Sequence, residues 1–168
     1  MPQPVTVPSP LGDLVLRTER EDDADFRLEL FKGSRAPEWY MIQWEPNLLE
    51  QIMRQQFHAQ TGSYAQQFPH ARFDIIELDG QPIGRIVVDR PDDQVHLVDL
   101  AIAPDRRGRG LGEAILRALM AEAEAAGRPV RLEVASSNDP SMRLYHRLGF
   151  RQVDETPLYI AMEWRTQG

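Results

Sequence analysis

The sequence predicts an α/β (α+β) fold in which a mixed, mostly antiparallel central sheet of six to seven strands is flanked by about four helices. A hairpin in the first half of the chain and a strand–helix–strand unit in the second half predict this fold. In the hairpin, apolar strands at 73–78 and 83–89 flank Asp79-Gly80, a dipeptide that suits a tight turn requiring positive φ. These two strands should therefore pair antiparallel.

The second half contains a βαβ unit. A strand over 95–102 leads through a glycine-rich loop into a long helix over 112–126, which Gly127 ends before a strand over 130–135. Two consecutive strands joined by a helix should lie parallel, with a right-handed crossover. We therefore expect one parallel pair in the sheet.

The remaining elements follow from apolar periodicity and from helix-start signals. Glu21 opens an acidic stretch suited to a helix N-terminus, and Asn47 with Glu50 resembles a capping box for a helix that runs to about Gln60. A polar loop is expected over 61–70. The other expected elements are strands at 14–17, 151–153 and 158–164, and a short helix over 140–148 that ends at Gly149.

Length and local composition indicate one domain. A chain of 168 residues can bury a core without disulfides or metals, and neither a repeat nor a linker interrupts it. Residues 1–11 hold four prolines and are expected to form a flexible N-terminal arm, followed by a single domain over 12–168.

Composition disfavours several classes of function. Cysteine is absent, which excludes disulfides and thiolate metal sites and suits a cytoplasmic enzyme. The first residues lack the charged and apolar regions of a signal peptide, and no apolar run approaches the roughly 18–20 residues that span a bilayer. The net charge of −7 argues against nucleic acid and mildly favours a cationic substrate. We therefore expect no membrane or nucleic-acid partner.

The loop over 104–112 is the most informative stretch for function. Its three alternating glycines would let backbone N–H groups approach an anion at the helix start, and its arginines add forked donors. It has neither the Gly-Lys-Ser/Thr end of a Walker loop nor the G-x-G-x-x-G spacing of a dinucleotide fingerprint. The loop favours binding of a phosphorylated cofactor, and the alternative is a plain glycine-rich turn with solvated arginines.

A second motif lies on the short helix. Asn138 precedes this helix and can cap it, and Asn138, Ser141 and Tyr145 share one helical face. Leu144 and Leu148 form an adjoining apolar stripe. The small Ser141 leaves space for a ligand to lie beside the helix.

Together the two motifs resemble the GNAT superfamily of N-acetyltransferases. Arg107-x-x-Gly110-x-Gly112 matches its R/Q-x-x-G-x-G/A signature, and the short helix matches its N-x-x-A/S-x-x-x-Y-x-x-x-G-F pattern. The resemblance implies a GNAT-like sheet whose parallel pair forms the cofactor cleft, a loop that wraps the pyrophosphate of acetyl-CoA, and a preceding strand that pairs with the pantetheine arm. The cofactor-binding residues that it implies are Leu100, Ala101, Ile102, Arg107, Gly108, Arg109, Gly110, Leu111, Gly112, Asn138, Ser141, Leu144 and Tyr145.

Tyr145 is also a catalytic candidate. Attack of an amine on the thioester expels a thiolate that must gain a proton, and a phenol with a pKa of about 10 is protonated at neutral pH and can donate one. The resemblance gives Tyr145 this role. The alternative is a tyrosine that packs on the core with a satisfied hydroxyl.

Three residues are candidates for the base that takes a proton from the amine. By two-residue alternation His96 shares a face with Leu100 and Ile102, unless a bulge intervenes, and its ordinary pKa near 6.5 suits neutral pH. Asp99, on the opposite face by the same count, is the second candidate, and Glu133 is the third. The alternative for His96 is a partly buried strand histidine bonded to a neighbour. No histidine has metal-ligand spacing, so no metal is expected.

The sequence leaves the acceptor open. By resemblance, residues 26–60 shape its pocket, where Trp39, Tyr40 and Trp44 either line an ammonium site or anchor the helices on the sheet. We expect acetyl transfer to the primary amine of a small molecule. The alternatives are a protein or peptide amine, and a non-catalytic acyl-CoA-binding module. An exposed edge of the terminal strands could support a homodimer.

Overall fold

The computed structural model describes residues 2–33, 46–136 and 138–166. The strands are β1 (Val5–Val7), β2 (Leu14–Thr18), β3 (Arg72–Leu78), β4 (Gln81–Asp89), β5 (Val95–Ile102), β6 (Val130–Ala135), β7 (Arg151–Glu155) and β8 (Tyr159–Trp164). The helices are α1 (Ala24–Gly33), α3 (Pro46–Gln67), α4 (Leu111–Ala126) and α5 (Asp139–Arg147), with short 3-10 turns at Glu21–Asp23 and Pro104–Arg106.

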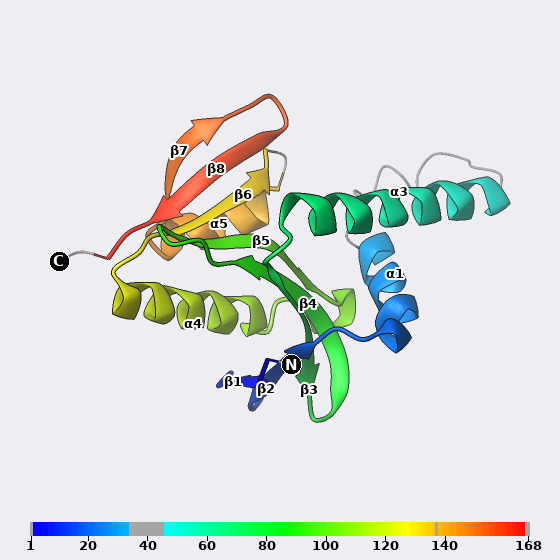
Figure 1. Ribbon diagram of the computed structural model, residues 1–168, viewed down its shortest axis with the longest axis horizontal. Coiled ribbons are helices and arrows are strands. Elements are labelled where there is room, and N and C mark those ends of the chain that lie inside the picture. Colours follow the sequence, from blue (N-terminus) through cyan, green and yellow to red (C-terminus); the bar gives the residue numbers. More distant parts are fainter. Residues whose placement is uncertain (1, 34–45, 137, 167–168) are drawn as a thin grey trace.

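The eight described strands form one sheet in the order β1-β2-β3-β4-β5-β6-β8-β7. Neighbouring strands are antiparallel except for β5 and β6, which are parallel (Figure 1). The predicted mixed sheet with one parallel pair is therefore confirmed. The predicted hairpin is confirmed too, since Asp79 and Gly80 both have positive φ, at 52° and 76°.

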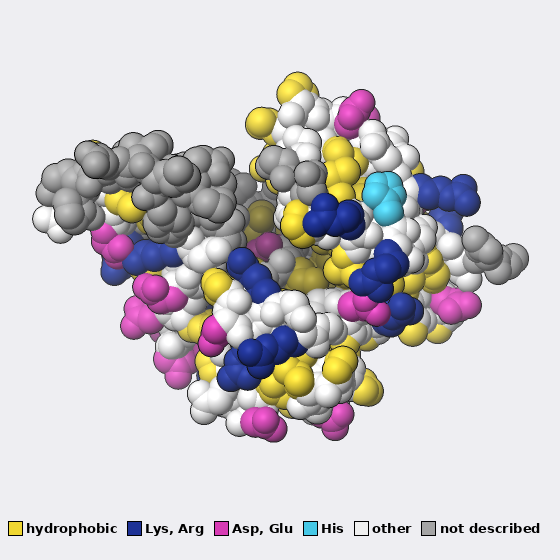
Figure 2. Space-filling model, turned by 180° about the vertical axis from the view of Figure 1, so that it is seen from behind, with side chains coloured by type: hydrophobic (Ala, Val, Ile, Leu, Met, Phe, Trp, Pro, Cys, Tyr) yellow, Lys and Arg dark blue, Asp and Glu magenta, His cyan; other side chains and the backbone are white. Residues whose placement is uncertain are grey.

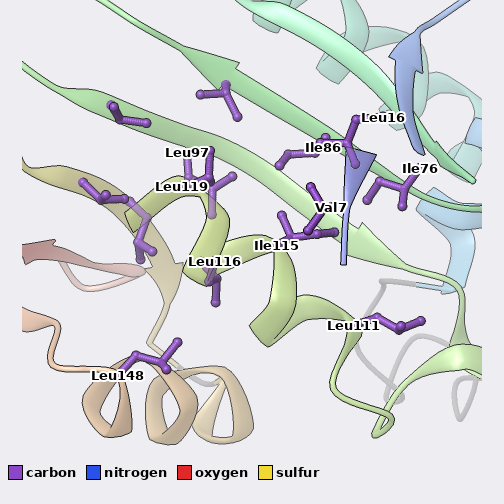
Figure 3. Close-up of a cluster of buried hydrophobic side chains, with 14 of the residues drawn as sticks. Val7, Leu16, Ile76, Ile86, Leu97, Leu111, Ile115, Leu116, Leu119 and Leu148 are labelled. Carbon is purple, nitrogen blue, oxygen red and sulfur yellow. The ribbon is translucent and has the colours of Figure 1, made fainter. Parts of the chain in front are cut away.

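Helices cover the two faces of the sheet separately. The helix α4 packs against one face, and α1 with α3 lies on the other (Figure 1). The main core fills the α4 face, where side chains such as Ile115 and Leu119 lie among strand residues such as Leu97, and Leu148 of α5 joins the same core (Figure 3). A second cluster forms between α1 and α3 from Leu28, Phe31, Met53 and Phe57.

The parallel pair is short, and this opens the sheet. Strand β5 pairs with β6 from Val95–Val130 to Leu97–Leu132, and no pairing between the two strands follows among the described residues. At the same place β5 contains a bulge, because its register against β4 passes from Leu97 to Asp99 between adjacent β4 residues and leaves Val98 unpaired. The edge of β5 that faces β6 is therefore free of strand partners over 98–102.

Two expectations fail in the N-terminal half. Residues 5–7, expected within a flexible arm, form β1 on β2, because Val7 buries its side chain in the main core with 3% exposed. This strand raises the number of strands above the expected six to seven. The loop expected over 61–70 is instead helical to Gln67, where the Tyr64 and Phe68 rings touch across one turn.

The expected capping box of α3 is also wrong. The helix begins at Pro46, so Asn47 lies inside its first turn. The Glu50 carboxylate accepts hydrogen bonds from Lys32 of α1 at 2.6 Å and from Arg54 at 3.0 Å. It therefore joins α1 to α3 instead of capping a helix. Among the described helices, none has both the length and the hydropathy needed to cross a membrane.

Candidate active site

The loop between β5 and α4 presents backbone donors at a helix start. Gly108 and Gly110 have φ of 74° and 80°, in the left-handed region that favours glycine, and Gly110 caps α4. Within the described residues, no backbone carbonyl accepts from the N–H of Gly108, Arg109 or Gly110. Unpaired N–H groups at the start of a 16-residue helix are a site for an anion such as a diphosphate.

Arg107 stabilises this loop from within. Its Nε donates to the carbonyl oxygen of Ile102 at 3.0 Å, and its Nη2 donates to that of Gly33 at 3.3 Å. Two of its donors thus join the loop to the ends of β5 and α1. The side chain of Arg109, between Gly108 and Gly110, is exposed and has no hydrogen bond to another described residue.

Three of the predicted cofactor residues can offer only peptide groups. The side chains of Leu100 and Ile102 pack on the main core, and that of Leu111 is 2% exposed. The expected pairing with a pantetheine arm requires the backbone groups of Leu100 and Ile102, and Leu111 offers its N–H at the start of α4. Gly84 of β4 keeps the neighbouring strand close, because a Cβ at this position would lie 2.5 Å from the carbonyl oxygen of Ala101.

The helix α5 holds Tyr145 beside the opened strands. Asn138 caps this helix by accepting from the Ser141 N–H at 3.2 Å, as its spacing predicts. Leu144 and Tyr145 pack against the main core, and the Tyr145 ring lies 5.6 Å from that of Phe150. Burial, with a contribution from the Asp99 carboxylate, raises the pKa of Tyr145 to about 12. The phenol is therefore protonated throughout the neutral range.

The bulge in β5 places the two leading base candidates on the same face of the sheet instead of opposite faces. Leu100 and Ile102 pack on the α4 face, whereas His96 contacts the Phe68 ring at 5.4 Å and Asp99 pairs with Arg85. His96 and Asp99 therefore share the face covered by α1 and α3. Simple alternation, which placed His96 with Leu100 and Ile102, is wrong because the extra residue at 98 shifts the phase.

The two candidates lie in different surroundings on that face. The Asp99 carboxylate is 3.9 Å from Nη1 of Arg85 and acts electrostatically on Tyr145, beyond the point where β5 leaves β6. His96 lies where the strands still pair, and its burial lowers its pKa below the ordinary value, against the opposing attraction of Glu133. Glu133 itself is exposed on β6. The structure thus brings Asp99, rather than His96, near Tyr145.

The face of the molecule opposite to the one seen in Figure 1 has a hollow. Figure 2 shows this hollow near the centre, with hydrophobic and acidic atoms at depth and basic side chains around its mouth. A mouth of this sign suits a polyanionic ligand. Within the described residues, no group of three or more His, Asp or Glu side chains is placed to hold a metal ion.

The family of the protein follows from a comparison with family models. The model for the acetyltransferase (GNAT) family matches residues 34–150, which is more than half of the chain. The chain belongs to the GNAT family. It is an acetyl-CoA-dependent N-acetyltransferase, and the fold expected from the resemblance is confirmed.

Several relatives resemble this GNAT protein along most of its length. A Bacillus subtilis protein provisionally named a [ribosomal protein bS18]-alanine N-acetyltransferase is 28% identical over 137 residues, covering 81% of this chain and 80% of that protein. The paiA N-acetyltransferase of Thermoplasma acidophilum, solved in complex with coenzyme A, has a TM-score of 0.67 at 18% identity, covering 91% and 99% of the two chains. The Escherichia coli ribosomal-protein-S18-alanine N-acetyltransferase has a TM-score of 0.63 at 20% identity, covering 92% and 96%. At these identities the two structural matches show the fold alone.

The sequence analysis of this GNAT protein did not identify Arg85 as a residue near the site. Arg85, 4% exposed in the middle of β4, bonds to Glu19 and faces Asp99. A lone arginine in the apolar run 83–88 was the available signal. Three aromatic residues proposed to line the acceptor pocket lie outside the described residues: Trp39, Tyr40 and Trp44.

Proposed function

We propose that the acceptor is the primary amine of a small molecule, which attacks the acetyl-CoA thioester directly. The observation that supports this most is the separation of β5 from β6, with free loop amides on one side and Tyr145 near Asp99 on the other. A cavity of about 380 Å³ lies between α1, α3 and strands β2 to β4. Arg85 lines this cavity, and its Nη1 lies 3.9 Å from the Asp99 carboxylate. A volume of this size suits a small acceptor.

The described residues fit coenzyme A in three places. The N–H groups of residues 108–112 would hold the diphosphate, and the free edge over 98–102 would pair with the pantetheine amides. Acetyl-CoA supplies the activated acetyl group. Tyr145 then donates its phenolic proton to the leaving sulfur, a role that a raised pKa permits because the donor form is present at neutral pH.

The proposal gives the base role to Asp99 in place of His96. Asp99 lies beyond the paired part of β5 and is the carboxylate that acts on Tyr145. Its carboxylate lies 3.9 Å from Nη1 of Arg85, which fixes it on the face covered by α1 and α3. His96 is further back along the strand, against Phe68, in surroundings that keep its imidazole neutral.

The replacement Tyr145→Phe tests the proposed chemistry. Removal of the hydroxyl should lower turnover by roughly 10²–10⁴-fold, while coenzyme A affinity stays nearly unchanged because the ring still packs on Phe150. Thiol release over an amine panel and calorimetric titration with coenzyme A measure the two quantities. Unchanged turnover would remove Tyr145 from the mechanism.

A protein α-amine is the second candidate acceptor. It is favoured by the names of two relatives, the Bacillus subtilis and Escherichia coli alanine N-acetyltransferases. Competition between small amines and a peptide that begins with alanine separates the two candidates. A kcat/KM that is at least tenfold higher for the peptide would favour the protein acceptor, and the reverse preference would favour a small molecule.

A further inference from the structure

The cavity between α1, α3 and strands β2 to β4, called here the α1–α3 cavity, contains a cluster of unpaired polar atoms. Four of its lining side chains carry a buried polar atom that has no hydrogen-bond partner among the described residues: Thr18 Oγ1, Arg27 Nε, Thr61 Oγ1 and Arg85 Nη2. Buried polar groups in folded proteins are nearly always hydrogen-bonded. Four orphans around one cavity, drawn from β2, α1, α3 and β4, indicate that the cavity has a polar occupant.

The charges around the cavity give the sign of that occupant. The guanidinium groups of Arg27 and Arg85 both bond to the single carboxylate of Glu19, and Arg72 pairs with Asp74 at 2.6 Å. Three of the four charged residues that line the cavity are therefore arginines, and the fourth is Glu19, whereas Asp74 pairs with Arg72 from outside the lining. Asp99, 3.9 Å from Arg85, does not line the cavity and lies on the side toward β5.

A carboxylate matches both features. Carboxylate oxygens accept hydrogen bonds from guanidinium N–H groups and from hydroxyls, which are the two kinds of group left unpaired here. Water could satisfy the same donors but carries no negative charge to match the arginines of the lining. Phe73 and two alanines form apolar walls that would accept a side chain next to the carboxylate.

We propose that the α1–α3 cavity is a carboxylate subsite, so that the acceptor carries a carboxylate as well as its amine, as a free amino acid does. This rests on the proposed transfer to a small amine, because Arg85 joins the cavity to Asp99. The carboxylate end is held under α1 and α3, and the amine is directed toward β5 and the thioester.

Matched pairs of substrates test the proposal. Acetylation rates are measured for glycine, L-leucine and L-phenylalanine and for the three corresponding amides. The amide has the less basic amine and is the better intrinsic nucleophile at neutral pH, so chemistry alone favours it. We expect kcat/KM for at least one acid to exceed that of its amide at least tenfold, and equal or lower values for all three acids would overturn the subsite.

Variants of the cavity sharpen this test. Arg27→Gln and the milder Thr61→Val should move the acid-to-amide ratio toward one, whereas Arg54→Gln, on the exposed side of the same helix α3, should leave it unchanged. Thr61→Val keeps the test decisive if Arg27→Gln fails to fold through the loss of its contact with the Phe57 ring. A ratio that is unchanged in both cavity variants would contradict the proposal.

Calorimetric titration of the coenzyme A-bound protein with the same compounds separates this proposal from the proposed function. Binding of an acid but not its amide, without acetylation of either, would support the subsite and refute the small-amine transfer. Equal acetylation of acids and amides would support the transfer and refute the subsite. A crystal structure at saturating amino acid with water alone in the cavity would also overturn the subsite.

Discussion

Asp99 and His96 show how one residue inserted into a strand changes which side chains reach a site. The motif around Tyr145 could be read from the sequence, because helical spacing and the Asn138 cap both depend on local residues. Which side chains of β5 point to each face of the sheet could not be read from the sequence. The bulge at Val98 depends on how β5 pairs with β4, and that pairing is not visible in the local sequence. For the same reason the Glu19–Arg85–Asp99 group was not predicted.

The base assignment gives a prediction at this scale. Asp99→Asn should lower kcat/KM by roughly 10²–10⁴-fold, because the amide cannot take the amine proton, whereas His96→Gln should cost far less. Burial lowers the pKa of His96, so its neutral form persists at neutral pH and is lost only below its ordinary range. If His96 were the base instead, the acidic limb of the pH–rate profile would lie below about pH 6.5 and would disappear in His96→Gln.

The opposite outcome for these two variants would assign the base role to His96. If His96→Gln loses the acidic limb and most of its rate while Asp99→Asn retains both, the base is His96. The profiles of kcat/KM between pH 5 and 9 for the two variants and the wild type make the comparison.

At the scale of elements, the strand, loop and helix from β5 to α4 form the unit that would hold the cofactor. Their bounds were predicted to within a residue, because Gly127 and the apolar strands leave few alternatives. The sequence predicts an end of this helix at about Gln60, because Thr61, Gly62 and Ser63 are poor helix formers, whereas α3 runs to Gln67. Ring contacts further along the helix outweigh those local preferences.

Two glycines of the phosphate loop make a matched pair for mutation. Gly110 has φ of 80°, and a Cβ there would lie 3.2 Å from Cγ of Pro10, whereas Gly112 has no atom within 4 Å of such a Cβ. Gly110→Val should therefore weaken coenzyme A binding by about 10–100-fold through strain and lost amide contacts. Gly112→Ala should keep affinity within about twofold and raise the stability of α4 by about 0.5–1 kcal/mol.

Calorimetry with coenzyme A and thermal unfolding of both variants test this pair. Normal affinity in Gly110→Val would mean that the diphosphate does not approach this loop. Equal loss of affinity in the two variants would mean that any added side chain disturbs the loop, whatever its φ.

At the scale of the whole molecule, the N-terminal segment is part of the sheet. Four prolines in the first eleven residues pointed to a loose arm, but proline is tolerated at the ends and edges of sheets, and β1 is an edge strand. Its Val7 reaches the core shared with α4, and Arg72 bonds to the Gln3 carbonyl oxygen at 2.8 Å. Local composition could not predict this strand, because β1 forms only through its pairing with β2 and its contact with the core.

Substitutions at the two ends of β1 test this placement. Val7→Ala should reduce the free energy of unfolding by about 1–3 kcal/mol, because its side chain is 3% exposed, whereas Val5→Ala, at 45% exposed, should change it by less than about 0.5 kcal/mol. Urea unfolding of the full chain measures both. Equal, small effects would show that the segment contributes little to the core in solution.

A crystal structure of this chain with coenzyme A tests the central claim most directly. We expect the diphosphate to lie against the N–H groups of 108–112, the pantetheine to follow the free edge of β5 over 98–102, and the sulfur to lie within reach of the Tyr145 hydroxyl. Coenzyme A bound elsewhere, or a gap between β5 and β6 filled by the protein's own side chains, would contradict it.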